Sequence, residues 1–487
     1  MAGKQLPQHP IQFLAEKLSA EFEAMLRRQS KTVEEAISEY RRRYNRDPPA
    51  GFDKWFDYAK AHDSLIIDDF DSIGSSLEPL WKVEPAVLRE SVHNARTHGP
   101  QMGGFAIQDG EFQRVSDWMA EGMRDLLLPV VSDLPDVEVA INLLDEPRVL
   151  LNNPRTSSNV KFDDHSHQHA WSEITDSCIH GGPKTEGAPH QLSFENFGLS
   201  FIGDIEGSKD LCLHTEYHDL HGFFISPTTL LYTERAVPIF SQAKPSTFGD
   251  IVYPSIYYID RLGEYNEDDD LPWEDKQRTL YWAGSTTGSQ ASDENWHHHH
   301  RQRFIAMAQH LENTTNTFLT EVSPGNWQTY KSREILSSLY DAKFTAIIQC
   351  SYEQCAAEKS YFQPGPREDK KAGYKSRFVF DIDGNSFSGR YYTLLSSRSV
   401  VMKQTIFQEW HDDRLFPWVH YVPVSLQMDE LPESVRFLAL TEVGDAISRR
   451  IADAGRDWSR KSLRKEDHAI YLYRLMLEYA RVLRDDR

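Results

Sequence analysis

The apolar positions at the start of this chain recur with the spacing of a helix. Leu14 and Leu18 lie four residues apart, and this spacing places them on one face of an amphipathic helix. Thr32 and Glu35 have the spacing of a capping box at the start of a second helix. We therefore predict that residues 1–83 form an N-terminal helical arm that packs on a larger body.

Short apolar runs then alternate with helical patterns. The runs VEVAIN (137–142) and SRFVFDID (376–383) are the clearest, and both predict buried strands. Other runs of this kind occupy residues 230–233, 279–284, 344–349, 399–403 and 420–424. Short buried strands separated by helices are typical of parallel sheets. The predicted fold class is therefore α/β.

The 487 residues of the chain leave room for two such sheets. We predict two Rossmann-like domains, the first over residues 84–260 and the second over residues 261–431. Residues 432–487 have helical periodicity and form the predicted C-terminal helices. Within the first domain, residues 150–225 are polar and rich in Gly, Pro and His, which predicts an irregular insertion.

Charge and hydropathy exclude several classes of function. The chain has 53 Lys and Arg against 74 Asp and Glu, for a formal net charge of −21. A surface so negative repels phosphate backbones and anionic lipids, so we expect no nucleic-acid partner. No apolar run approaches the ~18 residues of a membrane helix, and the N-terminus lacks the apolar stretch of a signal peptide. The protein is therefore cytosolic, or a targeting segment lies outside this chain.

The segment DIDGNSFSGR is the first candidate for chemistry. A buried strand ends at Asp383, a loop of small residues follows, and a helix is predicted from about Ser388. Free N–H groups at such a point bind phosphate, and Arg390 adds a positive charge. Taken by itself, an ordinary strand–turn–helix capped by Ser388 is the better explanation of the pattern.

Two further segments have a similar form. YWAGSTTGS (281–289) is a strand followed by a small polar loop, which is either a second anion-binding loop or a flexible turn. Asp145 lies just past the VEVAIN strand and before Pro147. The carboxyl end of a strand is where α/β sheets bind ligands, so Asp145 is a candidate general base; a turn-forming role is the alternative.

Histidines form a third kind of cluster, which can ligate zinc. The candidate sets are His165, His167 and His169, and His214, His218 and His221. Asp381 and Asp383 form a DxD pair that invites a metal–nucleotide interpretation. The run His297–His300 we interpret as a solvated surface.

Several motifs occur together in an order that resembles glycosyltransferase family 90. They are LPDVEVAINLLDEP, VPIFSQAKPSTFGDIVYPSIYY, YWAGSTTGS and FVFDIDGNSFSGRYYTLL, followed by SVVMK and PWVHYVPV. This family includes the Rumi-type protein O-glucosyltransferases and the fungal capsule-associated xylosyltransferases. The segment EYRRRYNRDPPAGFDKWFDYAK resembles the larger fungal branch, and the resemblance extends over roughly residues 35–450.

The resemblance implies a fold and a reaction. Two Rossmann-like domains would face one another (a GT-B fold), the first on the acceptor side and the second binding a UDP-sugar. The reaction would be an inverting, metal-independent transfer without a cofactor, with xylose favoured and glucose next. The acceptor would be a hydroxyl of a glycan or glycoconjugate. The family also implies a secretory lumen (Golgi or ER) and a membrane anchor, which is absent from this chain.

The resemblance also assigns residues. Asp145 falls at the catalytic aspartate, the general base. The donor-binding residues are Gly384, Asn385, Ser386, Phe387, Ser388 and Arg390 in one loop and Gly284, Ser285 and Thr286 in another. Lys244 is a further candidate for the leaving diphosphate, and Glu409 for the ribose hydroxyls, by analogy with other two-Rossmann transferases.

The second donor loop departs from the family pattern. Ala283 stands where an arginine is usual, and Thr286 stands where Rumi-type members carry another arginine. One alternative function is therefore a carbohydrate-binding relative with weak or no catalysis. The other is a metal-dependent transferase or hydrolase that uses the histidine sets.

The four cysteines suggest two bridges. Cys350 and Cys355 are close enough in sequence for a short loop bridge, and Cys178 with Cys212 would close the irregular insertion. In an oxidising lumen both pairs should form disulfides, whereas a cytosolic protein would keep four reduced thiols. The sequon at Asn313 is compatible with a secretory route.

Overall fold

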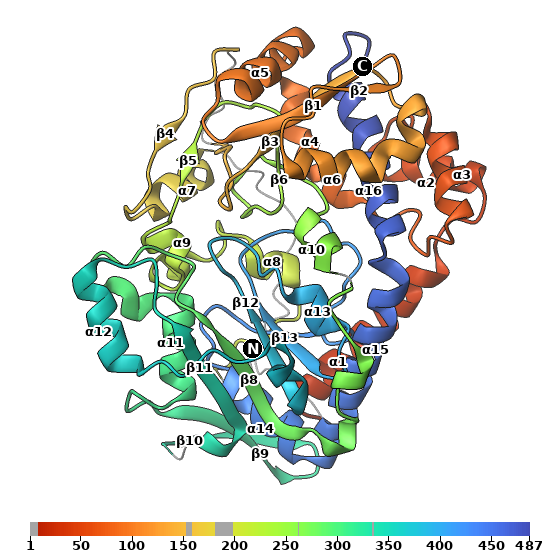
Figure 1. Cartoon of the computed structure of the whole chain (residues 1–487). Helices are drawn as coiled ribbons and strands as arrows, with labels where there is room; N and C mark the ends of the chain where they lie inside the picture. Colours follow the sequence, from red (N-terminus) through yellow and green to blue (C-terminus); the bar gives the residue numbers. More distant parts are fainter. Residues whose placement is uncertain (1–7, 152–157, 181–197, 262, 334–335) are drawn as a thin grey trace.

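The computed structural model describes residues 8–151, 158–180, 198–261, 263–333 and 336–487. These residues form a mixed α/β protein with two five-stranded sheets, one above the other in Figure 1. The α/β class predicted from the apolar runs is confirmed.

The upper sheet has the strand order β2-β1-β3-β6-β7. Its strands are β1 (Met102–Gln108), β2 (Glu111–Gln113), β3 (Val137–Asn142), β6 (Ile239–Ser241) and β7 (Ile251–Val252). Strands β3, β6 and β7 are parallel, but β1 is antiparallel to both of its neighbours. The β1–β2 connection is Asp109-Gly110, with φ of 51° and 74°, and positive φ at both positions favours a two-residue hairpin. A Rossmann-like first sheet would be parallel throughout, and only β3, β6 and β7 meet that expectation.

The lower sheet is parallel throughout, with the order β11-β8-β12-β13-β14. Its strands are β8 (Gln277–Ser285), β11 (Tyr340–Ala346), β12 (Ser376–Ile382), β13 (Val400–Gln404) and β14 (Val422–Pro423). Central strand β12 is buried along its whole length, as its apolar run predicts for a strand covered on both faces.

Helices cover both sheets. Those packed around the sheets are α5 (Pro85–His98), α6 (Trp118–Leu127), α10 (Ile256–Arg261), α11 (His300–Ala308), α12 (Tyr352–Phe362), α13 (Tyr391–Leu395) and α14 (Leu431–Leu440). The stretch between β3 and β6 of the upper sheet adds β4 (Asp163–Asp164), α7 (Trp171–His180), α8 (Ile205–Lys209), α9 (Gly222–Ile225) and β5 (Leu231–Tyr232). A hairpin of β9 (Asn316–Ser323) and β10 (Asn326–Ser332) extends the lower part.

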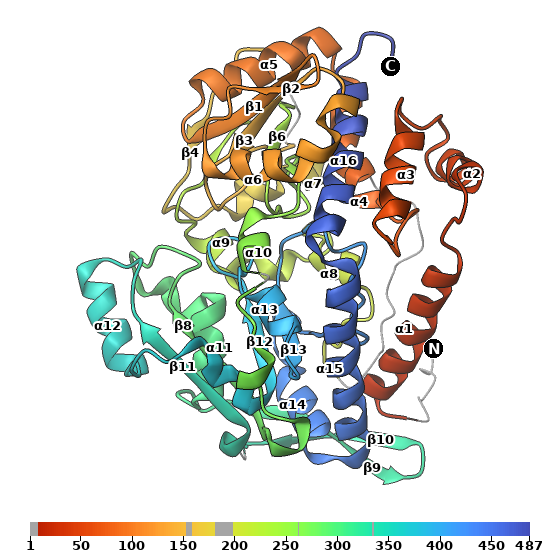
Figure 2. The ribbon, with the colours of Figure 1, turned by 45° about the vertical axis from the view of Figure 1, so that its right-hand side comes forward.

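The two ends of the chain pack together along one side. The N-terminal helices are α1 (Pro10–Arg27), α2 (Val33–Tyr44), α3 (Phe52–Ala61) and α4 (Asp71–Leu77), and the C-terminal ones are α15 (Glu442–Ser462) and α16 (Lys465–Val482). Figure 2 shows α15 and α16 running past both sheets, with α1–α4 beside them. The capping box of Thr32 and Glu35 is present. One buried apolar cluster joins α16 to both sheets, so these helices fasten the two halves to each other.

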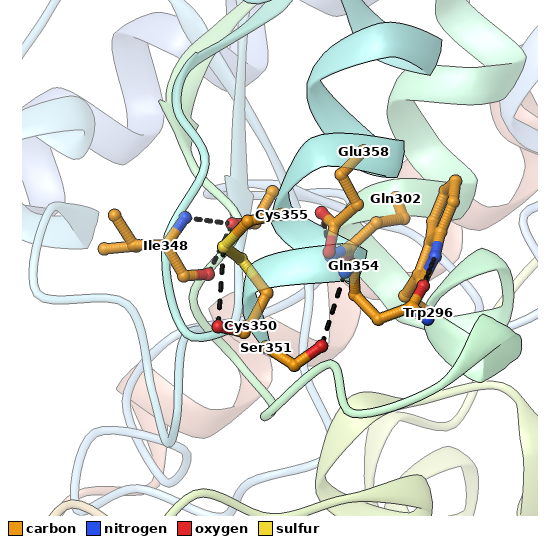
Figure 3. Close-up of a disulfide and its surroundings, with 9 residues drawn as sticks. Trp296, Gln302, Ile348, Cys350, Ser351, Gln354, Cys355 and Glu358 are labelled. Atoms are coloured by element: carbon orange, nitrogen blue, oxygen red, sulfur yellow. Dashed lines mark hydrogen bonds between the residues drawn. A yellow bond between two sulfur atoms is a disulfide. The ribbon is translucent and has the colours of Figure 1, made fainter.

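Both predicted disulfides are present, Cys178–Cys212 and Cys350–Cys355. The second joins the loop after β11 to the first turn of α12 (Figure 3), where Ser351 Oγ accepts a hydrogen bond from Gln354 N at 3.3 Å. Among the described helices, none is long and apolar enough to cross a membrane.

Candidate active site at the junction of the two sheets

The two strongest sequence motifs meet in space. Asp145 follows β3 of the upper sheet, and Asn385 lies in the loop after β12 of the lower sheet. Asn385 Nδ2 donates a hydrogen bond to Asp145 Oδ2 at 3.2 Å. Asp145 is exposed, and no described residue donates to its other oxygen, Oδ1. The candidate base and the candidate phosphate loop therefore form one site.

The amide of Asn385 has only one possible orientation. Its Oδ1 accepts hydrogen bonds from Gly288 N at 3.0 Å and from Thr228 Oγ1 at 3.2 Å. A backbone N–H can only be accepted by the oxygen of an amide, so the NH₂ group must face Asp145. Asn385 thus links both predicted loops to the upper half of the molecule.

The two small-residue loops lie directly against each other. Gly288 has φ of 120°, and a Cβ there would lie 2.6 Å from His300 Cε1 and 3.1 Å from Gly384 O. Only glycine fits such a close approach at positive φ. The loops predicted at residues 281–289 and 381–390 are therefore two walls of the same site.

Arg301 holds these walls together, and the sequence analysis did not identify it. It is 7% exposed; its Nε donates to Asp383 O at 2.7 Å, and its Nη1 donates to Ser285 O at 3.0 Å and to Thr287 Oγ1 at 2.6 Å. Burial and the nearby Arg390 lower its pKa to about 9, which leaves it charged at neutral pH. Arg301 follows the histidine run predicted to be a solvated surface, and that prediction is wrong for His299 and His300, which are 1% exposed.

Arg390 brings a second positive charge from the other side. Its Nη1 donates to Ala283 O at 2.9 Å, and the guanidinium groups of Arg301 and Arg390 lie 5.5 and 5.6 Å from the ring centre of Trp282. Arg301 and Arg390 thus place two guanidinium groups against the carbonyl oxygens of the loop that starts at Ala283.

The remaining residues of the second loop point elsewhere. Thr286 is buried; its Oγ1 donates to Ile348 O at 2.7 Å and accepts from Ile348 N at 2.8 Å, so its side chain holds the segment that follows β11. A Cβ on Gly284 would lie 2.7 Å from the Trp282 ring. Ser285 contributes its carbonyl to Arg301, and its hydroxyl lies 3.4 Å from Thr287 Oγ1.

The first loop differs from its prediction at its end. The helix starts at Tyr391, not near Ser388, and α13 has only five residues, so its dipole is weak. Ser386 and Ser388 are buried, and the Ser386 hydroxyl has no hydrogen-bond partner among the described residues. Phe387 packs 5.2 Å from the ring of Tyr258. Phosphate binding here would depend on loop N–H groups and the two arginines.

The sequence analysis also did not identify Glu146, which directly follows Asp145. It is 1% exposed, and its Oε1 accepts hydrogen bonds from Thr228 N at 3.0 Å and Thr229 N at 3.1 Å. Burial, together with the charge of Asp145, raises the pKa of Glu146 to about 7. Glu146 therefore fixes the loop that carries Asp145 to the segment that also holds Asn385.

Lys244 lies at the seam between the two halves. Its backbone exchanges hydrogen bonds with Gln408, at 3.2 and 2.7 Å. Its side chain is 5% exposed, and burial lowers its pKa to about 8, with Asp250 opposing. Among described residues, no hydrogen bond joins its ammonium to either small-residue loop, so its predicted diphosphate contact stays a prediction.

Glu409 is enclosed by protein groups. It is 2% exposed; Tyr258 Oη donates to its Oε2 at 2.5 Å, and Lys403 Nζ lies 3.5 Å from its Oε1. Burial raises its pKa to about 7, although Lys403 opposes the shift. Its Oε1 has no hydrogen-bond partner among the described residues, and its predicted ribose contact stays a prediction.

The histidine sets do not converge on a metal site. The rings of His221 and His300 stack with their centres 3.7 Å apart. His221 Nδ1 accepts a hydrogen bond from Phe223 N at 3.1 Å, so the ring proton of His221 is on Nε2. This Nε2 lies 3.4 Å from Asp383 Oδ2. Asp383 Oδ2 also accepts from Ile406 N at 3.0 Å. Over the ranges that the structure describes, no group of three or more His, Cys, Asp and Glu could hold a metal ion. The other predicted histidines bond separately, to nearby carboxylates and carbonyls, at His165, His169, His214 and His218.

The exposed carboxylate and the two small-residue loops thus meet where the two sheets adjoin, at the carboxyl ends of strands, which is where α/β proteins bind ligands. The model of the family described as glycosyl transferase family 90 matches residues 226–486. This is more than half of the chain, and the protein belongs to that family. The family resemblance noted in the sequence motifs is confirmed.

Named relatives agree with the family. Human protein O-glucosyltransferase 1 is 23% identical over 312 aligned residues, covering 59% of this chain and 66% of the relative. O-glucosyltransferase rumi of Drosophila melanogaster is 25% identical over 267 residues, covering 50% and 55%. Protein O-glucosyltransferase 2 of Danio rerio is 30% identical over 108 residues, covering 22% and 21%. The chain thus spans less than two thirds of the length of these curated relatives.

Proposed function

We propose that this protein is an inverting, metal-independent glycosyltransferase of GT-B architecture that uses a UDP-sugar and Asp145 as general base. The observation that carries the proposal is the hydrogen bond between Asp145 and Asn385, at 3.2 Å. It supports a site in which the upper half presents the base and the lower half holds the donor diphosphate.

The reaction follows from this arrangement. The acceptor hydroxyl attacks the anomeric carbon of the donor, the C–O bond to UDP breaks, and UDP leaves with that electron pair. Asp145 takes the hydroxyl proton on Oδ1, because Oδ2 is held by Asn385. The N–H groups of the two loops, with Arg301 and Arg390 behind them, stabilise the charge of the departing diphosphate.

Donor identity is proposed from resemblance. The fungal branch favours UDP-xylose, whereas the relatives above are named O-glucosyltransferases, so glucose is the second choice. The two sugars differ by a CH₂OH group that one side chain of the pocket can exclude. The acceptor is a hydroxyl of a glycan or glycoconjugate.

We place the protein in the secretory lumen, Golgi or ER. The support is the pair of disulfides, Cys178–Cys212 and Cys350–Cys355, because disulfides persist in oxidising compartments and are rare in the cytosol.

Substitution of the base tests the proposal. We expect Asp145→Asn to leave UDP binding nearly unchanged and to lower turnover by roughly a hundredfold or more, the range typical for a lost general base. UDP release with UDP-xylose and UDP-glucose is the assay, and calorimetry measures UDP affinity. The exposed Asp453→Asn, on α15, is a matched control that should behave as wild type. Turnover retained by Asp145→Asn would refute the assignment.

The alternative of an inactive carbohydrate-binding relative depends on Ala283 and Thr286. Arg301 and Arg390 reach the loops from other positions, which argues that charge for the diphosphate is retained. Sugar binding without UDP release over a broad acceptor panel would favour this alternative.

A further inference from the structure

Two large aromatic side chains form an exposed pair beside the candidate base. Trp118 is 42% exposed and Tyr257 is 36% exposed, and their rings meet edge to face with centroids 4.9 Å apart. Trp118 is the first residue of α6 and Tyr257 lies in α10; both views show these helices side by side between the two sheets (Figures 1 and 2). Paired aromatic rings left open to solvent are a feature of ligand-binding surfaces.

The start of α6 is held against the loop that carries Asp145. Asp117, the N-cap of α6, accepts a hydrogen bond from Gly104 N at 2.9 Å. A Cβ on Gly103 would lie 2.0 Å from Asp117 Oδ2 and 3.2 Å from Leu143 Cδ2. Asp117, the residue before Trp118, and Leu143, the first residue after β3, therefore approach the same point of β1, which places the start of α6 next to the Leu143–Asp145 loop.

Tyr257 reaches the same place from β7. Strands β3 and β7 are both parallel to β6, so Asp145 and α10 leave the sheet at the same edge. Arg261, at the end of α10, donates to Gly389 O at 3.1 Å, which joins α10 to the first donor loop. Partial burial and the charge of Asp145 raise the pKa of the Tyr257 phenol, which agrees with this proximity.

We propose that Trp118 and Tyr257 form an acceptor subsite that binds one pyranose ring of a carbohydrate acceptor beside Asp145. The inference rests on the proposed function, which requires an acceptor hydroxyl at Asp145. The C–H face of a pyranose packs on an aromatic ring, while its hydroxyl groups face polar partners. Asp145 and Arg261, whose charges both act on the Tyr257 phenol, offer such partners.

The surroundings favour a sugar over an extended peptide. A peptide that adds to a sheet needs a free edge strand with a row of open backbone groups. Of the two edge strands of the upper sheet, β7 has two residues, both buried, and β2 has only three, so neither offers a long row of open backbone groups. A sugar needs no backbone partner, and the aromatic pair with charged neighbours matches its mixed apolar and hydroxylated surface.

The test measures sugar binding apart from catalysis. Mannotriose and cellotriose are titrated into the full chain, with and without UDP, and binding is followed by saturation-transfer NMR and calorimetry. We expect wild type to bind at least one of them, and Trp118→Ala and Tyr257→Ala each to weaken that binding by about tenfold. Trp118→Phe should keep most of the affinity, and UDP affinity should not change in any variant.

A matched control separates the subsite from general loss of an exposed aromatic. Tyr330 on β10 is 43% exposed, and Tyr330→Ala should bind sugar as wild type. Unchanged sugar affinity in both alanine variants would overturn the inference, and so would a wild type that binds neither trisaccharide. Binding of a serine-containing peptide that depends on the aromatic pair, without sugar binding, would overturn the choice of a carbohydrate. Failure of UDP to bind wild type would count against the proposed function, while the trisaccharide titration still decides the subsite.

Discussion

Asn385 offers the sharpest test of how the two halves of the site cooperate. In Asn385→Asp the side chain still accepts hydrogen bonds from Gly288 N and Thr228 Oγ1, at 3.0 and 3.2 Å in the wild type. The NH₂ group that donates to Asp145 is replaced by a carboxylate oxygen. The substitution therefore keeps the loops in place and changes only the partner of the base.

The expected size of the effect follows from the geometry. The Asp145 and Asn385 side-chain atoms are 3.2 Å apart, and two negative charges at that distance repel by about 1–2 kcal/mol when water screens them. About 1.4 kcal/mol corresponds to one pKa unit, so the pKa of Asp145 should rise by about one unit. A base with a raised pKa is protonated, and inactive, up to a higher pH.

The lost hydrogen bond adds to this effect. A hydrogen bond to a charged group contributes roughly 1.5–3 kcal/mol, and a base that is no longer oriented loses turnover by about 10- to 100-fold. We therefore expect a lower kcat in Asn385→Asp, with the acid limb of its pH–rate profile moved up by about one unit. Asn385→Ala should lower kcat to a similar degree and move the acid limb up less than Asn385→Asp does, because it removes the hydrogen bond to the carboxylate of Asp145 but adds no negative charge.

The assay is UDP release from pH 5 to 9, with UDP affinity measured in parallel. Thr228→Val removes one hydrogen bond to Asn385 but leaves the contact to Asp145, so it should change kcat only a few-fold. A pH–rate profile of Asn385→Asp that coincides with wild type would refute the proposed coupling between Asn385 and the base.

Three other outcomes are expected. Activity should survive complete removal of divalent ions by EDTA, and loss restored by one added ion would instead support a metal-dependent mechanism. Folding raises the pKa of Glu146 from 4.5 to about 7, so its contribution to the free energy of unfolding is complete below pH 4.5 and falls as the pH rises toward 7. In Glu146→Gln, up to roughly 3 kcal/mol of this pH dependence should disappear, which is measured as the free energy of unfolding at pH 5 and at pH 8. Replacing Cys178 and Cys212 by Ser opens a loop with a sequence separation of 34 and should lower the free energy of unfolding by about 4 kcal/mol. The same change at Cys350 and Cys355, with a separation of 5, should lower it by about 2 kcal/mol. Equal denaturation midpoints for the two double variants would contradict this order.

The strands that could be predicted are those whose burial leaves a long apolar run. VEVAIN coincides with β3, and SRFVFDID contains β12, because a strand covered on both faces needs apolar side chains throughout. Strands β6 and β7 have only three and two residues, which is too short for any period to be visible. The antiparallel β1 was missed although Asp109-Gly110 is a hairpin signal, because Gly103 and Gly104 interrupt its apolar pattern.

The candidate site divides in the same way. Asp145 and the loop around Asn385 were predictable, since each follows a strand that the sequence marks clearly. Arg301 was not, because it follows a histidine run whose burial depends on the packing of α9 against the second donor loop: a Cβ on Gly222 would lie 2.5 Å from Gly288 O. Glu146 carries no sequence signal that separates a buried, hydrogen-bonded carboxylate from a solvated one.

The sequence by itself determined the α/β class, the family and the loops that carry the chemistry, because hydrophobic period and local motifs are properties of neighbouring residues. It made the two disulfide pairs an expectation for an oxidising compartment, and the structure decided that both form. Only the tertiary structure decided that the first sheet is mixed, that α13 is a short helix, and that Arg301 and Arg390 support the donor loops. It also decided that Asp145 meets Asn385, 240 residues further along. Such pairings depend on how α16 and the contacts between the two sheets hold the sheets together. No local sequence pattern encodes the direction in which a side chain points from one sheet toward the other.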